Sequence, residues 1–306
     1  NNRDDFGYGW RLEFRDTDLR TSLKKDEVYE QTGIRTEAFK EGTKVFITLP
    51  GGKREAFTFK PKRVTSIEGQ NIGIFANYFF VPEFTSEKGS TSTLTVAKNY
   101  ITYPNESNKL YGFQGSPYNP ADPIFGNKYI LTTKEGIVYE INATTGDLDT
   151  VTNPNGNKLT FTDAGITSDT GKGITFKRDA QGKIVSAIDP QGQMVKYQYD
   201  AKGDLIGVTD REDHTTLFKY TQPTRNHFLT EIVDPLGRSG IKTEYNDKGQ
   251  LTNLVDALGK SVVLAYDPTN SKQTVTDALG NPTTYIYDAR GNVVSELDAN
   301  GGLVTR

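Results

Sequence analysis

The stretch DALGKSVVLAYD at residues 256–267 and its near copy DALGNPTTYIYD at residues 277–288 decide the fold of this chain. The two stretches lie 21 residues apart, and each begins with Asp-Ala-Leu-Gly and ends with Tyr-Asp. Between these ends the alternation of side chains is typical of a strand that buries one face. Repetition at this spacing indicates a fold built from one supersecondary unit used several times.

The Asp-x-x-Gly tetrad recurs through the second half of the chain. The steps between leading aspartates are 21, 24, 22, 21 and 21 residues, and one copy ends in Asp instead of Gly. Glycine suits a turn position with positive φ, and an aspartate at the first position accepts hydrogen bonds from later amides. The tetrads are therefore predicted to be turns. Their first and last residues are Asp189 and Gly192, Asp210 and Asp213, Asp234 and Gly237, Asp256 and Gly259, Asp277 and Gly280, and Asp298 and Gly301.

A tyrosine ends the strand that follows each turn. It lies seven residues after the last tetrad residue in four units and eight residues after it in the other. Residues two and four positions earlier share its face, and we expect this row to pack against neighbouring hairpins. On that basis, truncation of Tyr266 is expected to remove a core side chain. The series is Tyr199, Tyr220, Tyr245, Tyr266 and Tyr287.

Each unit is predicted to contain two strands and two turns. The second turn follows the tyrosine, as at residues 200–203 and 288–291. An aliphatic residue lies two positions after the glycine of that turn, at Ile184, Leu205, Leu251 and Val293. A unit of about 21 residues buries little apolar surface alone, so successive hairpins must pair edge to edge in one sheet.

The first half of the chain does not repeat. Residues 44–49 and 54–59 alternate around a Gly-Gly pair, which predicts a hairpin, and residues 129–133 and 137–141 predict another. Residues 99–127 are rich in Pro, Asn, Gly and Tyr without a clear period, and we expect a long surface excursion there. With no convincing helical period of 12 or more residues, the prediction is an all-β chain. An irregular β-domain over residues 1–144 is followed by hairpin repeats over residues 145–306.

Composition excludes several classes of protein. The 306 residues carry 36 Lys plus Arg against 39 Asp plus Glu, a net charge of −3, and no cysteine. This balance gives no electrostatic footprint for nucleic acid, and no apolar run approaches a membrane span. Disulfides, thiol nucleophiles and Cys-based metal sites are excluded. Because the chain begins at Asn1 without Met or a signal segment, we expect it to be part of a longer or processed protein.

The Tyr-Asp pair at about 21-residue intervals resembles the YD repeats of the Rhs family, which includes bacterial Rhs and wall-associated proteins, Tc-toxin shell components and teneurins. The likeness covers residues 145–306, and the Phe-Gly-Tyr-Gly-Trp run at residues 6–10 is similar to the motif that opens such repeat regions. Residues 45–59 are similar to the hairpin that often follows it. The resemblance implies a hollow β-shell around a variable C-terminal polypeptide, or adhesion at a cell surface.

Two features limit what the resemblance implies. Toxin shells end in paired Asp-Pro motifs with a self-cleaving aspartate, whereas Asp189-Pro190 and Asp234-Pro235 here have no Asp-Pro partner about 21 residues on. No protease residue is therefore assigned. About seven units are too few to close a large shell, so the chain is expected to form the opening arc of a curved wall. Its only tryptophan, Trp10, is expected to anchor the first turn of that wall.

Catalytic and ligand sites have weak signals. His214 follows a turn and His227 lies in an insertion at residues 221–228, and neither belongs to a nucleophile–His–acid motif. Carboxylate pairs are too common among 39 acids to indicate a glycosidase. Calcium-binding β-rolls repeat their ligands about every nine residues, unlike these turns. The tyrosine row could stack on sugars, but its recurrence in unit after unit favours packing.

The predicted function is that of a non-enzymatic shell segment without a cofactor or metal. Its expected partners are the remainder of its own longer chain, with further repeats and a C-terminal toxin cargo. The alternative is a bacterial cell-surface module that binds a carbohydrate or a protein. In either case, the protein is expected to be secreted or displayed at the surface.

Overall fold

The computed structural model describes residues 5–12, 15, 17–23, 37–64, 66–67, 70–71, 73, 78–98, 101–112, 115–222, 225–289 and 291–305. The chain divides into two compact units. The N-terminal unit is Leu12–Lys172, and the repeat unit combines Gly173–Arg306 with the described part of Asn2–Arg11. The first residues of the chain therefore belong with its last strands. The predicted start of the repeats at residue 145 concerns the sequence pattern and stays a prediction.

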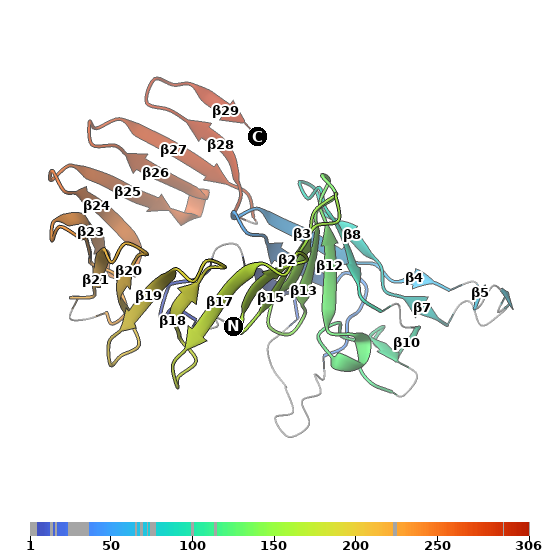
Figure 1. Ribbon diagram of the computed structural model, residues 1–306. Coiled ribbons are helices and arrows are strands. Elements are labelled where there is room, and N and C mark those ends of the chain that lie inside the picture. Colours follow the sequence, from blue (N-terminus) through green and yellow to red (C-terminus); the bar gives the residue numbers. More distant parts are fainter. Residues whose placement is uncertain are drawn as a thin grey trace. The chain divides into compact units, whose positions relative to one another are not determined.

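The repeat unit is a series of antiparallel hairpins, and each strand pairs with its neighbours in chain order (Figure 1). The all-β, hairpin-repeat prediction is confirmed. A short 3₁₀ helix, η3 (Pro268–Asn270), follows β25. The strands are β17 (Gly173–Arg178), β18 (Ile184–Ile188), β19 (Met194–Tyr199), β20 (Leu205–Thr209), β21 (Thr215–Lys219), β22 (Glu231–Val233), β23 (Ser239–Tyr245), β24 (Leu251–Asp256), β25 (Ser261–Asp267), β26 (Lys272–Thr276), β27 (Pro282–Tyr287), β28 (Val293–Leu297) and β29 (Leu303–Thr305).

The N-terminal unit contains several antiparallel sheets. One has the order β1 (Asp18–Thr21), β2 (Lys44–Thr48), β3 (Arg54–Phe59), β8 (Phe84–Ser86). A second has the order β11 (Leu110–Gly112), β10 (Thr102–Pro104), β7 (Phe80–Val81), β4 (Lys62–Arg63), and β5 (Ser66–Ile67) pairs with β6 (Gln70–Asn71). The remaining strands follow the order β9 (Thr93–Val96), β12 (Lys128–Thr132), β13 (Val138–Asn142), β14 (Leu148–Thr152), β15 (Lys158–Thr162), β16 (Gly165–Ser168).

Both hairpins predicted in the first half are confirmed. β2 pairs with β3, and β12 pairs with β13. Val45, Ile47 and Leu49 are all buried, as their shared face predicts. The turn between β2 and β3 has φ of 85° at both Gly51 and Gly52, a backbone conformation that only glycine adopts without strain.

The predicted surface excursion at residues 99–127 is wrong. This segment carries β10, β11 and the 3₁₀ helix η2 (Pro123–Phe125), and Tyr118 is fully buried within it. The Tyr118 ring stacks on Phe59 at 5.7 Å and meets Phe125 edge-on at 4.9 Å. Its many Pro, Gly and Asn residues shape a compact fold around an aromatic core, which a search for periodicity does not detect.

Membrane crossing by a helix finds no support in the structure. Among the described residues, no helix is long and apolar enough to span a bilayer.

Candidate functional site

The tetrads form one recurring turn in the repeat unit. In each, the leading carboxylate Oδ1 accepts hydrogen bonds from the backbone N–H groups two and four residues later, as at Asp189 from Gln191 and Gln193, both at 2.9 Å. The aspartates that do this are Asp189, Asp210, Asp234, Asp256, Asp277 and Asp298. The matching glycines have φ between 78° and 87°: Gly192, Gly237, Gly259, Gly280 and Gly301.

Bonding to the ionised form stabilises these carboxylates. The pKa of Asp210 is lowered because the backbone N–H groups of His214 and Glu212 bind its carboxylate. The pKa of Asp277 is lowered first by the side chain of Asn281 and then by the backbone of the same residue. Asp213, which replaces glycine, still adopts φ of 62°. The turn is therefore kept even where its preferred residue is missing.

The repeat tyrosines have a role that the sequence analysis missed. Their hydroxyls donate to a backbone carbonyl 15 or 16 residues earlier, near the start of the neighbouring strand. Each such bond ties one strand of the ladder to the strand before it through a side chain. The bonds run from Tyr199 to Ile184 at 2.6 Å, from Tyr220 to Leu205 at 2.9 Å and from Tyr245 to Leu229 at 2.9 Å.

Two later tyrosines depart from this pattern. Tyr287 donates to the side chain of Gln273 at 2.8 Å, and Tyr266 is 36 % exposed. A β-bulge lies directly before Tyr199, Tyr245 and Tyr287, whereas the strand through Tyr266 stays in register to its end. Because a bulge re-aims the side chain that follows it, its absence changes the position of Tyr266. Tyr266 is therefore not the core side chain that its place in the series predicted.

Residues 5–10, here called the strap, lie against the tyrosine-bearing strands of the same unit. The backbone N–H of Ile184 donates to the Asp5 carbonyl at 2.8 Å, and the Asp5 carboxylate pairs with Arg178 at 2.6 Å. Phe6 is buried, with its ring 4.9 Å from that of Tyr197. Burial raises the pKa of Tyr197. The strap is thus held at its beginning by backbone, charge and ring contacts.

Gly7 permits the close approach of the strap to the sheet. Its φ is 80°, and a Cβ at this position would overlap the carbonyl oxygen of Gly203. Gly9 has a similar φ of 78°, but a Cβ there would meet nothing within 4 Å. Two glycines of one motif therefore have different constraints, since only Gly7 is required by packing as well as by conformation.

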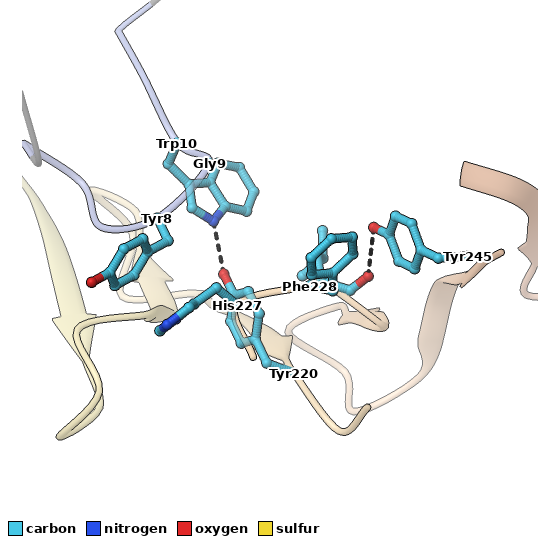
Figure 2. Close-up of a pocket in the computed structure, with 8 residues that line it drawn as sticks. Tyr8, Gly9, Trp10, Tyr220, His227, Phe228 and Tyr245 are labelled. Carbon is cyan, nitrogen blue, oxygen red and sulfur yellow. Dashed lines mark hydrogen bonds between the residues drawn. The ribbon is translucent and has the colours of Figure 1, made fainter. Parts of the chain in front are cut away.

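Trp10 anchors the other end of the strap. Its indole Nε1 donates to the Tyr220 hydroxyl at 2.7 Å, and that hydroxyl in turn donates to the Leu205 carbonyl (Figure 2). The indole also lies 4.7 Å from the ring of Phe218. The pKa of Tyr220 is raised because the group is partly buried, although the bond from Trp10 opposes this change. One tyrosine thus links the strap to the backbone of the sheet.

His227 connects the insertion to the strap. Its ring stacks on Tyr8 at 3.7 Å, and its Nδ1 lies 2.8 Å from the Asp204 carboxylate, which is almost completely buried. His227 has φ of 68°, a left-handed conformation uncommon outside glycine. The interpretation of His227 as structural agrees with these contacts. Asp204 had no signal in the sequence, because its partner is 23 residues away. His214 remains an exposed turn residue.

A cavity of about 480 Å³ lies next to Trp10. The Phe228 ring meets the Tyr245 ring edge-on at 4.9 Å on its far side from the strap (Figure 2). Within the described residues, no group of three or more His, Cys, Asp or Glu could hold a metal ion. The cavity is lined by Tyr8, Gly9, Trp10, Tyr220, His227, Phe228, Leu229 and Tyr245.

Antiparallel hairpins with Asp-x-x-Gly turns and tyrosine–carbonyl bonds define a hairpin-repeat shell protein. The chain belongs to the teneurin YD-shell family, whose model matches residues 146–303, just over half of its length.

Three curated relatives share part of this region. The tRNA3(Ser)-specific nuclease WapA of Bacillus spizizenii is 27% identical over 173 residues, which are 55% of this chain and 7% of that protein. The Double-stranded DNA deaminase toxin A of Burkholderia cenocepacia is 32% identical over 139 residues, 43% of this chain and 9% of that protein. Teneurin-m of Drosophila melanogaster is 22% identical over 123 residues, 40% of this chain and 4% of that protein. The chain thus spans less than a tenth of each relative.

Among solved structures, the crystal structure of TcdB2-TccC3-TEV matches with a TM-score of 0.32 and 14% identity. The match covers 88% of this chain and 16% of that one.

Proposed function

We propose that this chain is a segment of a β-shell that encloses or presents a polypeptide encoded further along a longer chain, and that it carries out no catalysis itself. The observation that supports this best is the uninterrupted ladder from β17 to β29, in which each strand pairs with the next. Such a ladder leaves no gap between neighbouring strands through which a second polypeptide could pass.

The relatives support the same proposal. Two of them are named as a nuclease and a DNA deaminase toxin, and this chain corresponds to less than a tenth of each. Most of the length of those proteins therefore lies outside the region that resembles this chain. In our proposal, any toxin activity belongs to such an outside segment. The protein is secreted or displayed at a bacterial surface, and its main partner is the rest of its own chain.

The proposal is tested by limited proteolysis of the longest natural polypeptide that contains this segment. We expect the polypeptide downstream of the repeats to be cleaved at least tenfold more slowly in the intact protein than when it is expressed alone. Equal cleavage rates would overturn the enclosing role. Saturable binding of the intact protein to a cell surface, without any such protection, would establish the adhesion alternative instead.

A further inference from the structure

We propose that the cavity beside Trp10 holds an aromatic side chain of an extended polypeptide segment, a ligand that continues the row of rings begun by the strap. The inference rests on the proposed function, because an enclosed or presented polypeptide supplies the segment. It starts from the rings that already cover the tyrosine-bearing strands. Phe6 covers Tyr197, Trp10 covers Phe218, and Phe228 contacts Tyr245.

The first argument is continuity with an interface that the structure contains. The strap is a short peptide with an aromatic ring at every second residue, Phe6, Tyr8 and Trp10. These rings contact strands further and further along the chain, from Tyr197 in β19 to Phe218 in β21. The cavity extends from Trp10 and Tyr220 to Tyr245, the tyrosine of the following repeat. It is thus the next position along the surface that the strap already occupies.

The second argument is the chemistry of the lining. The Trp10 N–H, the Tyr220 hydroxyl and the Tyr245 hydroxyl each already donate a hydrogen bond to a protein oxygen. A sugar brings several hydroxyls that need partners when they are buried, whereas an aromatic ring needs none. Rings that meet edge to face also gain about 0.5–1.5 kcal/mol beyond their buried area. The lining therefore favours an apolar ring over a carbohydrate.

The third argument concerns the backbone of the occupant. The strap reaches the sheet because Gly7 has no Cβ at the point of closest approach. A segment that follows the same surface needs small residues beside its ring for the same reason. We therefore take acetyl-Gly-Phe-Gly-amide as the probe and acetyl-Gly-Ala-Gly-amide as its matched control. A cavity of about 480 Å³ lies in the size range of ligand sites in proteins.

The test uses the fluorescence of Trp10, the only tryptophan of the chain, which lines the cavity. Titration with the phenylalanine peptide is expected to change the emission saturably, and the alanine peptide is expected to bind at least tenfold more weakly. Tyr245→Ala should weaken binding about tenfold. Tyr266→Ala is its matched control, because Tyr266 belongs to the same series but does not line the cavity, and it should leave binding unchanged.

A second measurement covers the case in which Tyr245→Ala does not fold. Nuclear Overhauser effects between the peptide phenyl ring and the Trp10 indole should appear in the parent chain. The proposal is overturned if the peptide gives no saturable response, if both peptides respond equally, or if N-acetylglucosamine binds in its place. Because binding is measured on this chain alone, it can fail while the downstream polypeptide is still protected, and the reverse also holds.

Discussion

The hairpins covered by the strap and those beyond it share one sequence pattern but differ in burial. The aliphatic residue after the second turn is almost fully buried at Ile184 and Leu205, with exposures of 0% and 2%. The same position is only partly buried at Leu251 and Val293. The difference shows that in this repeat unit the core depends on segments outside the repeat itself, here the strap and the insertion.

The tyrosine series gives the same result. Tyr220 bonds to both the strap and the sheet, whereas Tyr266 is 36 % exposed. The two regions use the same turns and the same ladder, so these features cannot explain the difference. Coverage of the tyrosine face can, and substitutions at equivalent positions in the two regions measure its effect.

The largest expected effect is a deletion in the covered core. Leu205→Ala should destabilise the repeat unit by about 3 kcal/mol, because it removes a buried side chain and leaves a cavity. Leu251→Ala, at the equivalent position, should cost only about 1 kcal/mol because Leu251 is already partly exposed. Urea unfolding followed by circular dichroism measures both. Equal losses would contradict the comparison between the regions.

The second expected effect separates the two glycines of the strap. Gly7→Ala should cost about 2 kcal/mol, since it combines positive-φ strain with a clash against the sheet, and it should release the strap. Gly9→Ala introduces only the conformational strain, about 1 kcal/mol, and the strap should stay bound. Trp10 emission reports the outcome: a shift to longer wavelength is expected for Gly7→Ala only. If Gly9→Ala gives the same shift, packing at Gly7 is not what holds the strap.

The third expected effect concerns one hydroxyl group. Tyr220→Phe removes the acceptor for Trp10 and the donor to Leu205, and it should cost about 1 kcal/mol. Tyr266→Phe is the control in the uncovered region and should change stability by less than about 0.5 kcal/mol. Thermal unfolding of the two variants beside the parent provides the comparison. A larger loss for Tyr266→Phe would show that the tyrosine hydroxyls act independently of coverage.

The features predicted from the sequence were those that depend on nearby residues. A turn such as 189–192 involves an aspartate, a glycine and amides within four residues, so its pattern is visible in any one repeat. The strap could not be placed in this way. Trp10 and its partner Tyr220 are 210 residues apart, and no local pattern connects them.

The exception at Tyr266 did have a signal in the sequence. The turn that follows it reads Asp267-Pro268-Thr269-Asn270, without the glycine of the other units, and it folds as η3 instead. Its left-handed position passes to Ser271, with φ of 52°. A regular spacing of tyrosines concealed this difference, because position in the series alone was taken to set the role of the side chain.

The smallest expected effect should be the same in both regions, because it depends on turns and not on coverage. Asp210 and Asp277 have lowered pKa values, so their folded-state pKa lies below that of the unfolded chain. Each carboxylate therefore stabilises the fold above the unfolded pKa, near 3.9, and that contribution is lost as the pH falls through the folded pKa. Asp210→Asn and Asp277→Asn keep the Oδ1 acceptor but do not titrate. Both should reduce the loss of stability below about pH 4 to a similar extent, as measured by thermal unfolding at pH 3 and pH 6. A response confined to Asp210→Asn would mean that the strap also strengthens the turns at the edge of the sheet, and coverage would then extend beyond the tyrosine face.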